Sequence, residues 1–249
     1  MSGVPPAWYG VDPGAEHEEV DDLPPPWGLG VVFAGYFGSV FLALVVASVL
    51  ITAAPSLTTG VSGVVVSSLG LWVGFGLTFL VATRSCATWR DRARAVGLRV
   101  RWTDPLVGLP AGIATQLVGV PVLYWIVFRF VEEQDVSEAA KSLISRGDGI
   151  GIVILTMVVG FGAPFMEELL FRGLLQRASV AALGPRLGVP LVAVLFGLTH
   201  FQVLQLPGLL LAGLVFGWLA HATGRLGPAI WAHVGFNLST VAIIVSTAP

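Results

Sequence analysis

Long apolar runs separated by short polar stretches dominate this chain. A transmembrane helix needs about 20 mostly apolar residues, and the pattern predicts about seven such spans, with six to eight compatible with the crowded second half. The predicted spans are residues 29–53, 61–83, 104–131, 149–171, 187–204, 207–223 and 228–247. The predicted fold class is therefore all-α, a polytopic transmembrane helical bundle.

Composition supports a membrane environment. The 249 residues are 55% hydrophobic and 11% charged, whereas soluble domains carry about 25% charged residues. The lipid bilayer is therefore a predicted partner, and the absence of a basic face excludes nucleic acid. The single cysteine, Cys86, excludes an internal disulfide and a cysteine-rich zinc cluster.

Polarity also divides the chain into three parts. Residues 1–28 hold six acids and show no apolar periodicity, which predicts a disordered acidic cytoplasmic tail. Residues 29–148 are predicted N-terminal transmembrane helices, interrupted by an arginine-rich cytoplasmic loop at 84–101. Residues 149–249 form a predicted helical core, which holds the candidate catalytic chemistry.

The arginines predict the orientation. The loop 84–101 holds six arginines and one acid, and such loops stay cytoplasmic and contact lipid headgroups. Counting spans then places the N-terminus inside, the acidic loop 132–148 outside, and Arg172, Arg177, Arg186 and Arg225 inside. The lone lysine among 13 basic residues is typical of a GC-rich genome. We therefore expect a multi-pass protein of a bacterial cell membrane.

Ionisable side chains are rare after residue 148, and each one requires an explanation. A charge within a spanning helix costs about 3 kcal/mol or more unless it is paired or functional. The polar residues form three motifs, Glu167-Glu168-x-x-x-Arg172, Phe196-x-x-x-His200 and His233-x-x-x-Asn237. Taken singly, each histidine motif is also compatible with side chains that only hold helices together.

The two adjacent glutamates face different directions. Glu168 and Arg172 are four residues apart on one helix face, with the acid first, which favours an ion pair. Glu167 lies about 100° around the helix and is free for another partner. An interfacial salt bridge alone would therefore leave Glu167 unexplained.

Helix geometry predicts that the three motifs converge. Gly184-Pro185 is a predicted turn between antiparallel helices. Glu167 lies 17 residues before Gly184 and His200 lies 16 residues after it, so they should share one depth. Later turns near residues 207 and 224 bring His233 to the same layer. Independent packing groups have no reason to coincide in this way.

This set of side chains suits peptide hydrolysis. Glu167 and His200 could take a proton from water and return it to the leaving amine. His233 and Asn237 could donate hydrogen bonds to the tetrahedral oxyanion. Alternatively, Glu167, His200 and His233 could hold a zinc ion that activates the water. The sequence leaves both mechanisms open.

The three motifs, in this order and spacing, resemble the CAAX prenyl endopeptidase and bacteriocin-processing family, formerly the abortive-infection family. The resemblance covers roughly residues 149–245 and implies an intramembrane endopeptidase acting on a membrane-associated protein or peptide. It implies that Glu167 and His200 activate water and that His233 and Asn237 stabilise the oxyanion. It also implies support from neighbouring residues, namely Glu168, Arg172 and Phe196. Members of this family are commonly labelled metalloproteases.

Two other functions remain as alternatives. A proton-coupled transporter also uses buried Glu and His, but the polar pattern has no repeat in the first half. A non-catalytic membrane partner or immunity protein would keep the fold without proteolysis. Ser62, in Gly60-Val-Ser62-Gly63, resembles a rhomboid serine but lies far from any candidate histidine. We expect His221 to be interfacial, and Gly70-x-x-x-Gly74 and Gly213-x-x-x-Gly217 to be helix-packing sites.

Overall fold

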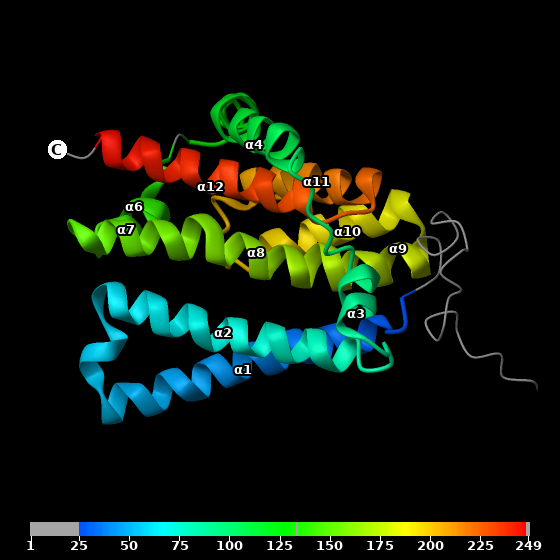
Figure 1. The fold of residues 1–249 in the computed structure, drawn as a ribbon. Coiled ribbons are helices and arrows are strands. Elements are labelled where there is room, and N and C mark those ends of the chain that lie inside the picture. The colour runs from blue at the N-terminus through cyan, green and yellow to red at the C-terminus, as the bar shows by residue number, and fades with distance from the viewer. Residues whose placement is uncertain (1–24, 133, 248–249) are drawn as a thin grey trace, which may run out of the picture.

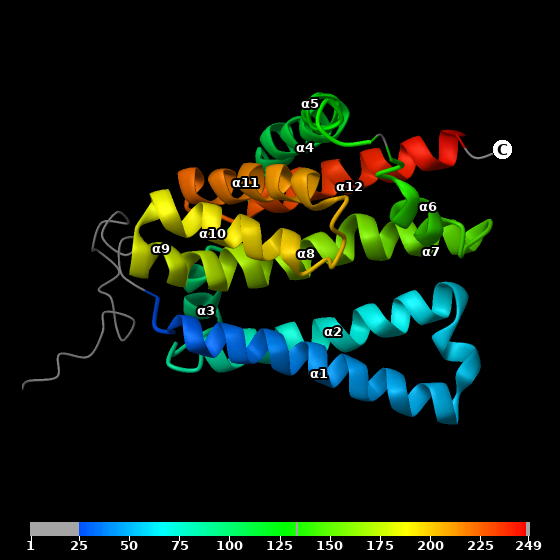
Figure 2. The same cartoon turned by 180° about the vertical axis from the view of Figure 1, so that it is seen from behind.

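The structure, a computed structural model, describes residues 25–132 and 134–247, and within them every regular element is a helix (Figures 1 and 2). In this part of the chain, six helices are long and apolar enough to cross a membrane, and a seventh apolar helix is shorter. They are α1 (Leu29–Ala53), α2 (Gly60–Ala82), a helix at Asp104–Val127, a helix at Ile150–Leu183, α11 (Leu206–Thr223), α12 (Gly227–Thr247) and the shorter α10 (Pro185–Leu198). The predicted all-α bundle of about seven spans is confirmed. Residues 1–24 of the predicted tail lie outside the described residues.

The fourth long helix differs from the predicted span 149–171. It continues through α7 (Ile150–Met157), η3 (Val158–Gly162), α8 (Ala163–Glu168), η4 (Leu169–Gln176) and α9 (Arg177–Leu183). The apolar run ends at Arg172, but both Arg172 and Gln176 are buried and hydrogen-bonded to a neighbouring helix. Polar side chains with such partners continue a buried helix at little cost. The sequence pattern alone could not reveal those partners.

Shorter elements close the two ends of the bundle. The 3₁₀ turn η1 (Pro55–Thr58) links α1 to α2, and α6 (Glu138–Ile144) precedes α7. At the other end, α3 (Trp89–Ala95) starts with a capping box, in which Thr88 and Asp91 each bond the other's backbone N–H. Figures 1 and 2 place α3 and α9 at one end and α6 at the opposite end.

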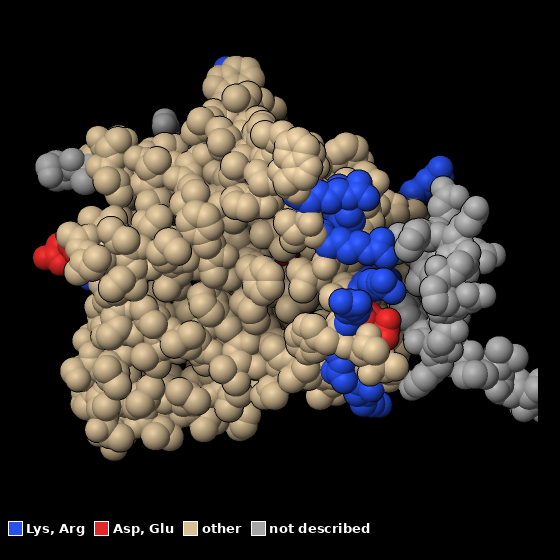
Figure 3. Space-filling model, in the orientation of Figure 1, with Lys and Arg blue, Asp and Glu red and all other residues tan. Residues whose placement is uncertain are grey.

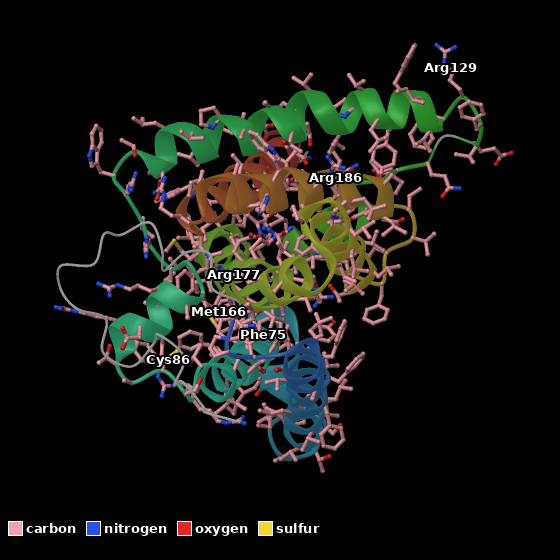
Figure 4. The ribbon with its side chains drawn as sticks, turned by 90° about the vertical axis from the view of Figure 1, so that its right-hand side faces the viewer. Phe75, Cys86, Arg129, Met166, Arg177 and Arg186 are labelled. Carbon is pink, nitrogen blue, oxygen red and sulfur yellow. The ribbon has the colours of Figure 1, made fainter. Side chains whose placement is uncertain are left out.

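The helix at Asp104–Val127 lies across the others rather than alongside them (Figures 1 and 4). It comprises α4 (Asp104–Ala114), the π-helical η2 (Thr115–Gly119) and α5 (Val120–Val127), with Arg129 just beyond its end. Its first half packs on α12, where a Cβ on Gly112 would lie within 2.7 Å of the Ala232 carbonyl carbon. This close approach requires glycine, as small-residue motifs between membrane helices do.

The two predicted glycine motifs also lie at helix contacts. A Cβ at Gly74 would come within 2.6 Å of Ser39 Cα on α1, and one at Gly213 would meet Ala193 Cα on α10 at 3.0 Å. Both motifs are thus confirmed as packing sites. The outer surfaces of the long helices are rich in exposed large apolar side chains, including Phe41 and Trp218. This distribution is that of a multi-pass membrane protein.

The arginines collect at one end of the bundle, which we call the arginine face (Figure 3). Nine arginines belong to the loops and helix ends there: Arg84, Arg90, Arg92, Arg94, Arg99, Arg101, Arg177, Arg186 and Arg225. Arg225 pairs with the buried Asp104 at 2.6 Å. Trp27 falls within the predicted disordered tail, residues 1–28, but it is buried and its indole N–H donates to Leu174 O at 3.1 Å, so the tail boundary was predicted too late in the chain. The cytoplasmic orientation of this face remains a prediction.

Candidate active site

Glu167 and Glu168 close α8 and occupy different environments. Glu168 is fully buried, and its Oε1 accepts a hydrogen bond from Arg172 Nη1 at 2.7 Å, so the predicted ion pair is confirmed. The Glu167 side chain retains 21% of its exposure. Of these two successive carboxylates, Glu168 therefore belongs to a buried ion pair, and Glu167 remains an accessible acid.

His233 on α12 stands between the two glutamates. Its Nδ1 lies 2.9 Å from Glu168 Oε1, and its Nε2 lies 3.8 Å from Glu167 Oε2. Because an ionised carboxylate can only accept hydrogen bonds, Nδ1 must carry the proton that bonds to Glu168. Nε2 then donates a hydrogen bond only when the imidazole is protonated.

His200 lies in the turn that follows α10. Its Nδ1 lies 2.8 Å from Phe196 O, and a carbonyl only accepts, so Nδ1 donates and Nε2 of the neutral ring is left as an acceptor. The next residue, Phe201, has φ +53° and is 87% exposed. A bulky residue in this left-handed region is strained, and the sharp bend it makes ends the helix several residues before the predicted boundary at 204.

Asn237 lies one helical turn after His233. Its Nδ2 donates to Val159 O at 2.9 Å, across from α12 to η3. Val159 belongs to a π-helical turn, and such turns interrupt the regular ladder of backbone hydrogen bonds and recur at functional sites. The contact fixes the Asn237 amide through one N–H and leaves the second available.

Two phenylalanines pack between these polar groups. Phe196 is 1% exposed, with its ring centroid 4.9 Å from that of His200 and 5.6 Å from that of His233. Phe216 on α11 stacks on His233 at 4.8 Å. The Arg172 guanidinium carbon lies 4.5 Å from the Phe196 ring centroid, within the range of a cation–π contact. Phe196 was predicted to support the site, whereas Phe216 was missed.

A polar ladder fixes the helix of the two glutamates against α11. Arg172 Nη2 donates to Gly213 O at 3.1 Å, and Gln176 Nε2 donates to Gly217 O at 2.9 Å. The i, i+4 spacing of the donors matches that of the two glycines, and the absence of side chains on the glycines exposes their carbonyls. Gln176 was also missed, although its spacing from Glu168 and Arg172 was a usable signal.

Glu167, His200, His233 and Asn237 line one cavity of about 460 Å³. Phe196 and Phe216 also line it, whereas neither Ser62 nor His221 does. The structure therefore brings together the four residues that the sequence analysis selected. Ser62 Oγ instead donates to the carbonyls of Ser56 and Thr59, at 3.0 and 2.8 Å.

The predicted zinc ligands do not assemble into a metal site. Across residues 25–132 and 134–247, no three His, Cys, Asp or Glu side chains form a group that could hold a metal ion. Of the predicted set, Glu167 and His233 make the one ion-pair contact, at 3.8 Å. We therefore derive no chemical step through a metal.

Comparison with known proteins gives one result. No curated protein and no solved structure matches the chain. Residues 149–239 match the family model of type II CAAX prenyl endopeptidase Rce1-like proteins. The region that carries Glu167, His200, His233 and Asn237 is thus similar to intramembrane CAAX proteases, which confirms the family resemblance carried by the three motifs.

Proposed function

We propose that this chain is an intramembrane endopeptidase that hydrolyses a peptide bond of a membrane-associated protein or peptide. The observation that carries the proposal is the convergence of Glu167, His200, His233 and Asn237 on one cavity. These residues come from α8, from the turn after α10 and from α12, and the region around them resembles a protease family. A packing role alone would not require all four side chains to face the same space.

In the proposed reaction, Glu167 and His200 act on one proton. The Glu167 carboxylate, assisted by His200 Nε2, removes a proton from water as the water oxygen attacks the peptide carbonyl. The same pair then delivers that proton to the amine nitrogen as the C–N bond breaks. Glu167 is suited to this role because its charge is not committed to a buried partner at hydrogen-bond distance.

The negative charge of the tetrahedral intermediate needs donors. The free N–H of Asn237 supplies one, and protonated His233 supplies the other from Nε2. Glu168 supports the orientation of His233, because it accepts the hydrogen bond from Nδ1. Arg172 in turn holds Glu168 in place.

The test is hydrolysis of a library of membrane-anchored peptides by the purified protein in detergent, read by mass spectrometry. We expect new carboxyl and amino termini with the wild type and none with Glu167→Gln. Glu167→Gln should elute and melt like the wild type, which separates loss of chemistry from loss of fold. Absence of cleavage by folded wild type across the library would contradict the proposal.

The same assay addresses the zinc alternative. The mechanism without a metal predicts that cleavage continues after exhaustive treatment with a chelator. Loss of activity that zinc restores would instead assign Glu167, His200 and His233 as ligands. Glu167→Gln is inactive under either mechanism, so the chelation result is what decides between them.

A further inference from the structure

The cavity is closed toward the arginine face. On that side of Glu167 lie Leu170, Arg172, Leu174 and Phe216, each at most 1% exposed. None of the residues that line the cavity is an arginine. A peptide could not reach Glu167 from the arginine face without displacing these buried side chains.

The cavity extends instead toward the end that carries α6. Its lining there comes from α6 and the preceding residues, from the turn between α10 and α11, and from the last turns of α12. These residues are Val136, Ser137, Ala140, Leu143, Ile144, Gln202, Gln205, Thr240, Val241 and Ile244. Gln205 Nε2 donates to Val136 O at 2.9 Å and so joins two of the segments at this end. Figures 1 and 2 show α6 and the arginine-bearing helices α3 and α9 at opposite ends of the bundle.

The charges of the two ends differ in sign. Among the described residues, two acids, Asp91 and Asp104, accompany the nine arginines of the arginine face. The loop 128–149 at the α6 end holds five acids and three basic residues. The excess of arginine in short loops predicts that the arginine face lies in the cytoplasm. The α6 end then lies on the other side of the membrane.

We propose that the cavity opens on the side of the membrane opposite the cytoplasm and receives a substrate segment presented from that side. The access side follows from the packing and the arginines, whereas the identity of the occupant as a substrate rests on the proposed function. The substrate is therefore a membrane-associated peptide or protein whose cleavable segment is exposed on the side of the membrane opposite the cytoplasm.

The lining also defines the chemistry of that segment. Among the described residues that line the cavity, Glu167 is the one acid, and no lysine or arginine accompanies it. The other walls combine apolar side chains with the carboxamides of Gln116 and Gln202, both half-buried. Apolar walls accept apolar side chains, and carboxamides both donate to and accept from a peptide backbone. The segment next to the cleaved bond is uncharged and extended.

Thiol labelling tests the access side without any reference to catalysis. Cys86 is buried, and burial raises the pKa of its thiol, so the native cysteine is a weak target. In a Cys86→Ser background, Ser137→Cys reports the mouth, Thr240→Cys reports the interior, and Arg90→Cys is the control on the arginine face. Each variant is treated in intact cells with a small membrane-impermeant thiol reagent, before and after lysis.

We expect Ser137→Cys and Thr240→Cys to react fully in intact cells, and Arg90→Cys to react only after lysis. Reaction of Thr240→Cys only after lysis, in a variant that melts like the parent, would overturn the proposal. So would reaction of Arg90→Cys from outside. External labelling of Thr240→Cys without peptide hydrolysis would leave the access side standing and contradict the proposed function.

The predicted segment chemistry has its own arm in the peptide assay. Peptides that the wild type cleaves are remade with one Arg or one Glu within three residues of the cleaved bond. We expect at least a tenfold loss of cleavage, with Gln at the same position as the matched control. Equal cleavage of the Arg, Glu and Gln peptides would contradict the prediction that the segment beside the cleaved bond is uncharged.

Discussion

The N-terminal hairpin of α1 and α2 and the C-terminal helices from α7 to α12 are both built from apolar spans, yet they bury different kinds of side chain. Of the 25 residues of α1, Val32 and Ser39 are buried, whereas nine of the 21 residues of α12 are buried, His233 among them. The hairpin turns large apolar groups such as Phe41 outward. The C-terminal helices surround Glu168, Arg172 and Gln176 instead.

The difference reflects what each region must bind. Lipid tails are as apolar as leucine, so a helix that faces lipid gains little by burying its apolar side chains. A charged group gains a great deal from partners within the protein, because lipid offers none. The polar residues of the C-terminal helices therefore determine which surfaces meet. Mutations should accordingly have large effects in the C-terminal region and small ones on the outer face of the hairpin.

The largest effect is expected at the proton path. Glu167→Gln and His200→Ala should each reduce turnover on the order of 10⁴-fold, as expected for loss of general acid–base catalysis. The double variant should be no slower than the worse single variant, because both residues act on the same proton. Single-turnover rates measured in detergent provide the comparison. Multiplied losses in the double variant would show that the two residues act on separate steps.

A matched pair of phenylalanines tests the comparison through stability. Phe216 is fully buried against His233, so Phe216→Ala should lower the free energy of unfolding by about 3–5 kcal/mol and reduce activity. Phe41 is 69% exposed on α1, and Phe41→Ala should change it by less than about 0.5 kcal/mol. Thermal unfolding of the two variants in the same detergent measures the contrast. Similar losses at both positions would place Phe41 in an interface.

A smaller loss is expected at Asn237. Asn237→Ala removes one proposed oxyanion donor, which costs about 10²–10³ in rate. It also leaves Val159 O without its side-chain donor, so a modest decrease in melting temperature should accompany the loss. Asn237→Asp keeps the size but cannot donate when ionised, and should be at least as slow. A wild-type rate for Asn237→Ala would remove it from the mechanism.

Periodicity and spacing predicted the spans and the common cavity, although the ends of two helices differ from the predicted boundaries. The spans and the Glu168–Arg172 pair follow from local rules, since apolar runs and i, i+4 spacing depend only on nearby residues. The common cavity followed from helix lengths and three turns, because rise per residue fixes depth. The assignment of catalytic roles to the four residues remains a prediction.

What the sequence did not predict depends on contacts between distant segments. The extension of the fourth helix to Leu183 needs the carbonyls of Gly213 and Gly217 as partners for Arg172 and Gln176. The contact of Asn237 with Val159 depends on a π-helical turn that no residue pattern predicts. The oblique packing of α4 on α12 likewise depends on contacts between residues that are far apart in the sequence. In each case a polar or small residue was visible in the sequence, but its partner was not.

The most direct test of the account compares the two adjacent glutamates. Glu167→Gln and Glu168→Gln remove the same charge from neighbouring positions, and turnover is measured per folded molecule, together with the melting temperature. The proposed mechanism predicts that Glu167→Gln melts like the wild type and does not cleave. It predicts that Glu168→Gln melts at a lower temperature, because Arg172 loses its buried partner, and that its folded fraction still cleaves. Cleavage by Glu167→Gln at the wild-type rate would contradict the account.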